Sequence, residues 1–215
     1  MAQPDLFAPP PPAREPLSAG ALLLRGFARD AAPELLAGIA AIAEQAPFRH
    51  MVTPGGFAMS VAMTSCGALG WVTDRRGYRY AGRDPDSGAP WPAMPAGFRA
   101  LAQAAAAEAG FADFQPDTCL INRYVPGAKL ALHQDRDERD TGAPIVSVSL
   151  GLPAVFQWGG LQRGDALRRL ALEHGDVLAW GGPSRLFHHG VLALKPGHHP
   201  ATGAARLNLT FRRAG

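Results

Sequence analysis

The chain has 215 residues, of which 47% are hydrophobic and 18% are charged. These values favour one domain with a substantial core and exclude a disordered polyelectrolyte. The formal net charge of +3 is compatible with a polyanionic partner but does not require one.

The beginning of the chain shows no pattern of a signal peptide. Its longest apolar run, Ala21–Leu24, is far too short to cross a bilayer. The two cysteines, Cys66 and Cys119, are too few for a disulfide framework. We therefore expect a reduced, cytoplasmic protein that does not associate with a membrane.

Proline dominates the first residues: six prolines stand in residues 4–16, where they disfavour both helix and central strand. We expect residues 1–16 to form a flexible tail and residues 17–215 to form a single domain. The first predicted strand of that domain covers Ala21–Phe27.

Two helices are predicted in the first half of the chain. Asp30 can cap the first helix, Pro33 suits its first turn, and Pro47 ends it. The second helix is predicted from Pro95 to Ala109, an alanine-rich segment followed by Gly110. We expect both helices to brace a sheet.

Residues 49–82, between the predicted helices, have a different character. Short predicted strands alternate with glycine-rich loops, and aromatic side chains alternate with arginines. Loops of this composition favour ligand binding. The side chains concerned are Phe57, Met59, Met63, Trp71, Tyr78, Tyr80, Arg49, Arg75, Arg76 and Arg79.

From Thr118 onward the pattern predicts many short strands separated by Gly, Pro or Asp. They cover Leu120–Tyr124, Lys129–His133, Ile145–Leu150, Val155–Trp158, Arg168–Leu172, Val177–Trp180, Phe187–Leu192 and Arg206–Arg212. This spacing indicates a sandwich or barrel, here a jelly roll of about eight strands in residues 118–213. The predicted fold class is mostly β with flanking helices (α+β).

His133 and Asp135 form the first candidate for chemistry. Residues two apart in an extended chain point to one face, so one imidazole and one carboxylate can bind the same ion. Two histidines and a carboxylate form the facial triad of non-haem iron(II) oxygenases, which leaves positions open for O₂ and a cosubstrate. A histidine by itself is more often an ordinary core or surface residue.

The third ligand stays open at this point. His174, His198 and His199 lie in predicted turns or loops, whereas His188 and His189 lie in a predicted strand. Neighbouring strand residues point to opposite faces, so only one of these two can face the barrel. Periodicity does not decide which one.

The segment Arg206–Arg212 is the second candidate. Period 2 places its arginines, Asn208 and Thr210 on one face and apolar residues on the other. A face with two guanidinium groups suits a dicarboxylate ligand, because guanidinium pairs with carboxylates in a bidentate manner. The alternative is a solvated outer face.

These residues, together with longer stretches, resemble the AlkB family of iron(II)- and 2-oxoglutarate-dependent dioxygenases, which repair alkylated bases. The match covers nearly the whole chain after the proline-rich residues. It includes Met51–Gly56, Trp91–Pro95, Phe114–Asp117, Leu120–Tyr124, His133–Asp135, Ile145–Pro153 and Asn208–Arg212. The chain departs from the family pattern at Trp158, His188 and residues 201–205.

The resemblance implies a double-stranded β-helix (jelly-roll) core, with residues 49–82 as a nucleotide-recognition lid. It implies that His133, Asp135 and His189 bind Fe(II) and are catalytic, with O₂ as cosubstrate. It implies that 2-oxoglutarate is bound by Leu120, Asn122, Tyr124, Leu130, Trp180, Arg206, Asn208, Thr210 and Arg212. It implies that the nucleic-acid substrate is bound by Met63, Trp71, Tyr78, Lys129, Gln134, Asp137 and Arg163.

The implied reaction is oxidative dealkylation of bases of the 1-methyladenine and 3-methylcytosine type. The implied partner is alkylated DNA, single- or double-stranded, with RNA as an alternative, and we expect a monomer. The same chemistry on a protein, lipid or small molecule is the main rival. A non-catalytic jelly-roll binding module and a zinc hydrolase are two further alternatives.

Overall fold

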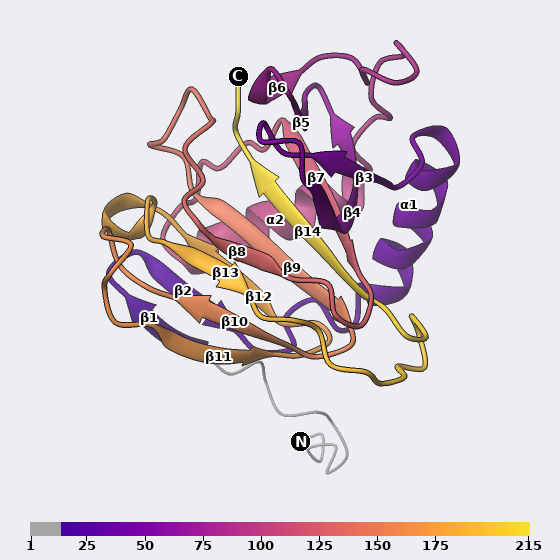
Figure 1. Ribbon diagram of the computed structural model, residues 1–215. Coiled ribbons are helices and arrows are strands. Elements are labelled where there is room, and N and C mark those ends of the chain that lie inside the picture. The colour runs from indigo at the N-terminus through magenta and orange to yellow at the C-terminus, as the bar shows by residue number, and fades with distance from the viewer. Residues whose placement is uncertain (1–13) are drawn as a thin grey trace.

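The computed structural model describes residues 14–215 (Figure 1). The expected tail falls mostly on residues 1–13, which lie outside the described residues. Its predicted end at residue 16 was wrong, because Arg14–Ser18 forms strand β1, which pairs with β2 (Ala21–Leu24). Pro16 is tolerated there because β1 is the edge strand of its sheet.

The fold is built on two facing sheets. The larger sheet has the strand order β1-β2-β12-β9-β14-β7-β4-β3, and the smaller has the order β11-β10-β13-β8. The remaining strands of the larger sheet are β3 (Arg49–Val52), β4 (Ala58–Gly67), β7 (Thr118–Tyr124), β9 (Ile145–Gly151), β12 (Val177–Trp180) and β14 (Arg206–Arg212). The smaller sheet contains β8 (Leu130–His133), β10 (Ala154–Trp158), β11 (Arg168–Leu172) and β13 (His189–Val191).

Strands β7 to β14 form the jelly roll. They divide into two facing groups, β12-β9-β14-β7 and β11-β10-β13-β8, and their pairing is antiparallel. The predicted fold class, mostly β with flanking helices and a jelly-roll core, is confirmed. Strands β1 and β2 extend the larger sheet at one edge, and β4 and β3 extend it at the other.

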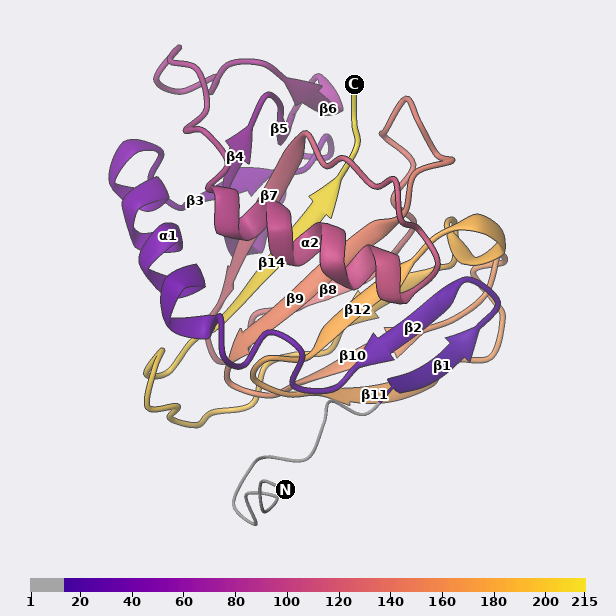
Figure 2. The same cartoon turned by 180° about the vertical axis from the view of Figure 1, so that it is seen from behind.

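Helices α1 (Ala32–Gln45) and α2 (Ala96–Glu108) cover the outer face of the larger sheet (Figure 2). Their apolar side chains form one buried cluster with those of β4, β9, β12 and β14. In this cluster Phe98 of α2 meets Phe211 of β14 edge to face, with ring centroids 6.2 Å apart. The predicted N-cap of α1 was wrong. Ala31 occupies that position without a side-chain hydrogen bond, because the preceding turn holds Asp30 one residue too early.

The segment 49–82 is partly integrated into the core. Strands β3 and β4 belong to the larger sheet, and β4 pairs with β7 along most of its length, so short strands were a wrong expectation for this part. Only β5 (Gly70–Asp74) and β6 (Gly77–Ala81) form a separate two-stranded sheet. Gly70 lies directly against the ring of Trp91, where a side chain would not fit.

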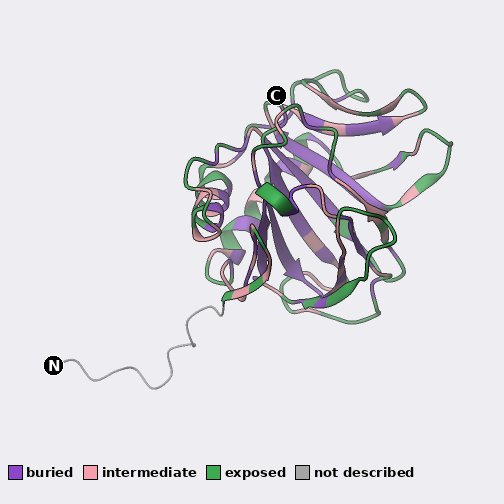
Figure 3. Cartoon of the chain, turned by 90° about the vertical axis from the view of Figure 1, so that its left-hand side faces the viewer, coloured by how far each residue is buried: buried purple, intermediate pink, exposed green. Residues whose placement is uncertain are grey.

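Burial follows this layering: the strands of the interior are buried, and the exposed residues concentrate in the outer turns and loops (Figure 3). Within residues 14–215, no helix has the length and apolar character needed to cross a membrane. The space between the two sheets is not filled completely. It contains the cavity described next.

Candidate active site

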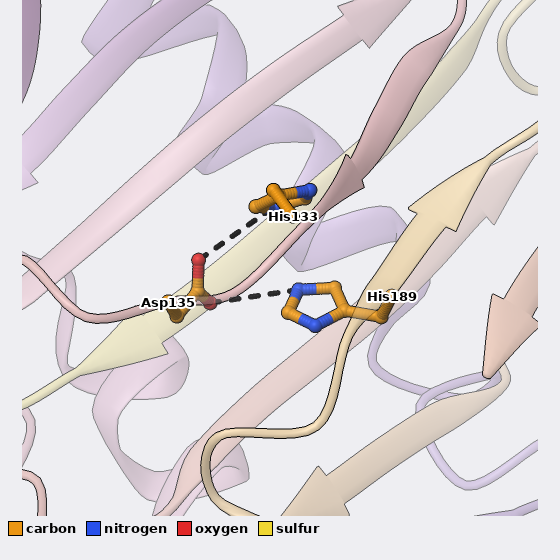
Figure 4. Close-up of side chains that lie close together, drawn as sticks. All are labelled: His133, Asp135 and His189. Carbon is orange, nitrogen blue, oxygen red and sulfur yellow. Dashed lines mark ion pairs between the residues drawn. The ribbon is translucent and has the colours of Figure 1, made fainter. Parts of the chain in front are cut away.

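Three side chains that can bind one metal ion meet between the two sheets (Figure 4). His133 ends β8 and His189 begins β13, and these residues are direct cross-strand partners. Asp135 follows His133 by two residues, and its carboxylate lies next to both imidazole rings. One ligand atom from each residue lies within 4.8 Å of the other two.

Both histidines are oriented by backbone carbonyl groups. His133 Nδ1 donates to the oxygen of Ala131 at 2.8 Å, and His189 Nδ1 donates to that of Phe187 at 3.0 Å. These bonds leave the Nε2 atoms free, and they face Asp135 at 3.6 Å and 3.8 Å respectively. A carbonyl that holds Nδ1–H fixes the tautomer in which Nε2 can bind a metal.

The charges of the triad suit a cation. Burial alone would raise the pKa of Asp135, but the Arg212 guanidinium, together with His133 and His189, holds that pKa well below its usual range. Burial, together with the nearby His133, lowers the pKa of His189 to about 4. At neutral pH Asp135 is therefore ionised and His189 neutral, the forms that coordinate metal ions. The pKa of His133 is raised instead, because the Asp135 carboxylate opposes the effect of burial, and a bound cation would displace that proton.

The second predicted cluster lines the same space. Arg206, Asn208, Thr210 and Arg212 all point into a cavity of about 660 Å³ that also contains the triad. Arg206 is only 1% exposed, so the alternative of a solvated outer face was wrong. The opposite, apolar face of β14 packs under the helices, as alternation predicted.

Three buried guanidinium nitrogens of the arginines that line this cavity have no hydrogen-bond partner among residues 14–215. Arg206 donates to Ser149 Oγ through Nη2 at 2.9 Å, but its Nε and Nη1 make no hydrogen bond within the described chain. Arg212 Nη1 likewise makes no hydrogen bond within the described chain. Buried guanidinium groups without partners are costly, so these donors fit a ligand with two acidic ends. The triad and the two arginines thus fit iron(II) and a dicarboxylate.

Aromatic side chains border the mouth of the cavity. Trp71 on β5 stacks on Tyr78 on β6, with ring centroids 5.6 Å apart and planes 17° apart. Trp71 Nε1 also donates to Asp137 Oδ2 at 2.9 Å. This hydrogen bond joins the β5–β6 hairpin to the loop that carries Asp135, and both aromatic side chains line the cavity that contains the triad.

The structure brings all of the predicted site residues to this one cavity. Besides the triad, it is lined by Met63, Trp71, Tyr78, Leu120, Asn122, Tyr124, Lys129, Leu130, Gln134, Asp137, Arg163, Trp180, Arg206, Asn208, Thr210 and Arg212. Among these side chains, Gln134 donates to the main-chain oxygen of Leu186, and Arg163 donates to that of Leu132.

The other histidines considered as the third ligand do not belong to the group that can bind the metal ion. His188 lines the cavity, but its Nδ1 lies 3.3 Å from the Gly160 carbonyl oxygen. His174 and His199 stack on each other with ring centroids 4.5 Å apart and do not line the cavity. His198 is likewise outside it.

Sequence reasoning missed four polar residues of the site. Ser147 and Ser149 accept from Asn208 and Arg206, and alternation along β9 would have placed them on this face. Glu138 and Arg185 form a buried ion pair close to Asp135. Their loops carry no periodic pattern, so the sequence offered no signal for them.

Comparisons with known proteins agree with this geometry. The family described as the 2OG-Fe(II) oxygenase superfamily matches residues 20–212. The alpha-ketoglutarate-dependent dioxygenase AlkB of Escherichia coli (strain K12) is 64% identical over 211 residues, which cover 98% of each chain. The nucleic acid dioxygenase ALKBH1 of Homo sapiens is 35% identical over 130 residues, which cover 60% of this chain and 33% of that protein. The solved structure of OsALKBH1 has a TM-score of 0.82 and 32% identity, and the match covers 94% of this chain and 100% of that one. The chain therefore belongs to the 2OG-Fe(II) oxygenase superfamily and, within it, to the AlkB family of alpha-ketoglutarate-dependent dioxygenases.

Proposed function

We propose that this dioxygenase removes alkyl groups from ring nitrogens of nucleic-acid bases, with lesions of the 1-methyladenine and 3-methylcytosine type as substrates. The proposed polymer is DNA, single- or double-stranded, with RNA as the alternative, and the proposed location is the cytoplasm. One observation carries this proposal: a single cavity joins the metal triad, the arginine-lined end and an aromatic mouth.

The cosubstrates of the enzyme are 2-oxoglutarate and O₂, and its metal is iron(II). Bound iron supplies the oxidising chemistry that converts 2-oxoglutarate and O₂ to succinate and CO₂ and hydroxylates the alkyl carbon. The hydroxylated group then leaves as an aldehyde and restores the base. His133, Asp135 and His189 are the proposed ligands of this metal.

The chain holds the cosubstrate by charge and shape. Arg212 donates to Asp135, and Arg206 lies at the other end of β14. We therefore expect the free donors of Arg206 to bind the carboxylate of 2-oxoglutarate that is farther from the metal. Arg212 donates to Asp135 at 2.6 Å, which places its free Nη1 at the metal end. Both arginines are buried, so the pairing takes place away from bulk water, where it is stronger.

The mouth of the cavity supports a base as substrate. A base must leave the stack before its ring methyl group can be reached, and aromatic side chains bind its exposed face. Trp71 and Tyr78 offer such a surface on the β5–β6 hairpin. Asp137 stands beside Trp71 and carries a negative charge, which favours the positive charge of 1-methyladenine and 3-methylcytosine.

The decisive experiment is aerobic incubation with iron(II), 2-oxoglutarate and a methylated single-stranded oligonucleotide, followed by mass measurement of the oligonucleotide. The expected result is loss of the methyl mass by wild type and none by His133→Ala. Equal masses after incubation with the two proteins would overturn the proposed function. Asp137→Ala should reduce the rate on cationic lesions relative to neutral ones.

The rival is the same chemistry on a protein, lipid or small molecule. Succinate formation alone does not separate the two, because every substrate of this enzyme class produces it. A competition assay does: excess alkylated oligonucleotide should suppress turnover of any other accepted compound. A compound that is turned over faster than the oligonucleotide at equal concentration would favour the rival.

A further inference from the structure

A network of buried charges surrounds the carboxylate of Asp135. Arg212 donates to Asp135 Oδ2 through Nε at 3.0 Å and through Nη2 at 2.6 Å. The same Nε lies 3.2 Å from Glu138 Oε1. Arg185, which follows the short 3₁₀ helix Gly182–Ser184, lies 3.1 Å from Glu138 Oε2. The network thus contains two arginines and two carboxylates.

Arg185 contacts both ends of the loop that carries Asp135. Its Nη1 donates to the main-chain oxygen of Asp135 at 2.7 Å, and its Nε donates to that of Ala143 at 2.9 Å. The loop between β8 and β9 contains no helix or strand, so it depends on such contacts for its position. Arg185 is 3% exposed, which excludes a fluctuating surface contact.

Glu138 extends the network to the β5–β6 hairpin. The hydroxyl of Tyr80 on β6 donates to Glu138 Oε1 at 2.6 Å. The carboxylate of Glu138 therefore has three partners, Tyr80, Arg185 and Arg212, and the residue is 7% exposed. Through Arg185 it is tied to the backbone of Asp135, and through Arg212 to its side chain.

We propose that Arg185 is a positioning residue for the metal centre: it fixes the backbone of Asp135 directly and its carboxylate through Glu138 and Arg212. The proposal rests on the assignment of Asp135 as a metal ligand. Groups that orient a ligand from behind typically change metal affinity by about 10- to 100-fold when they are removed. A purely structural arginine would change stability and leave metal affinity alone.

The chain offers a matched structural arginine. Arg25 also serves three acceptors, the carbonyl of Ala171 at 2.6 Å, Asp176 at 2.8 Å and Glu15 at 3.1 Å, and it does not line the cavity. Arg185→Lys and Arg25→Lys both keep the charge and lose the planar fork. The two variants therefore lose similar numbers of hydrogen bonds, one set next to Asp135 and the other outside the cavity. Because the side chain of Arg25 is 32% exposed and that of Arg185 only 3%, the loss of stability should be larger in Arg185→Lys.

The experiment titrates each protein with Co(II) and measures quenching of tryptophan fluorescence. Trp180 is a suitable reporter, because its ring centroid lies 5.2 Å from that of His189. The melting temperature of each protein is measured in parallel. Arg185→Lys should weaken Co(II) binding by about 10-fold or more, whereas Arg25→Lys should leave the Kd within about twofold of wild type.

An unchanged Co(II) Kd in Arg185→Lys would overturn the positioning role, whatever happens to the melting temperature. If wild type itself bound no Co(II), the metal site and with it the proposed function would be overturned instead. If Arg185→Lys does not fold, Glu138→Gln decides, because it keeps the shape and removes the charge. It should weaken Co(II) binding by about 10-fold, and a Kd within twofold of wild type would overturn the proposal.

Discussion

Arg206 and Arg212 are both buried on the same face of β14, but their charges are balanced differently. Arg212 pairs with Asp135 and Glu138, whereas no carboxylate in residues 14–215 pairs with Arg206. We therefore predict effects of opposite sign in the ligand-free protein: Arg206→Met should stabilise the fold, and Arg212→Met should destabilise it.

The magnitudes follow from the partners of each arginine. Two nitrogens of Arg206 are buried without a partner in the described chain, and a buried unsatisfied polar group costs about 1–3 kcal/mol. For the two nitrogens together that cost is about 2–6 kcal/mol. Methionine removes it but also loses the bond to Ser149 and the cation–π contact with Tyr124, so we expect a net gain of about 1–3 kcal/mol. Removing Arg212 leaves the buried carboxylate of Asp135 without its arginine, although Glu138 keeps Arg185, and breaking such a buried pair costs about 3–5 kcal/mol. For a domain of this size, 1 kcal/mol shifts the melting temperature by about 2–4 °C.

Thermal unfolding without ligand measures both predictions. The melting temperature should rise by roughly 2–12 °C in Arg206→Met and fall by roughly 6–20 °C in Arg212→Met. A second run adds Mn(II) and 2-oxoglutarate, and at about 100 times its Kd the cosubstrate should stabilise wild type by about 2.7 kcal/mol. Arg206→Met should gain only the contribution of Mn(II). A lower melting temperature for ligand-free Arg206→Met would refute the reasoning, because it would mean that the guanidinium is satisfied without a ligand.

Two further predictions concern the β5–β6 hairpin. A methyl group at Gly70 would overlap the ring of Trp91, so Gly70→Ala should destabilise the protein by about 1–3 kcal/mol, and a melting temperature equal to that of wild type would contradict this. Arg75 is exposed on the hairpin turn and has no ion pair within residues 14–215, whereas Arg76 is paired with Asp74. Arg75→Ala should therefore reduce the slope of log K against log salt for oligonucleotide binding by about 0.7–0.9. The exposed Arg169 on β11, away from the cavity, supplies the control variant, and equal slopes for Arg75→Ala and Arg169→Ala would count against the assignment.

The regular parts of the jelly roll could be predicted because their signals are local. Alternation in Arg206–Arg212 predicted both faces of β14, and the bounds of β11 and β12 agree with the predicted strands. The end of the predicted tail and the cap of α1 were wrong. Both depend on where a turn or a neighbouring strand places the backbone, and single residues do not reveal this.

The choice between His188 and His189 as the third metal ligand could not be predicted from the sequence for a different reason. The prediction placed both in one strand, but β13 begins at His189, and His188 lies in the irregular segment just before it. The decisive fact is the register that sets His189 opposite His133. Arg185 and Glu138 were missed for the same reason: they meet across 47 residues, and nothing local marks the pairing.

The hairpin that borders the cavity has its own hydrogen-bond ladder, separate from those of the two large sheets. Provided that Gly70 and Tyr80 keep their contacts with Trp91 and Glu138, its strands can therefore change in sequence without disturbing the pairing of β7, β9 and β14, which carries the buried polar face. We therefore expect that exchange of this one hairpin can change the substrate range. Grafting β5–β6 from a relative with another preference should transfer selectivity while cosubstrate turnover is retained.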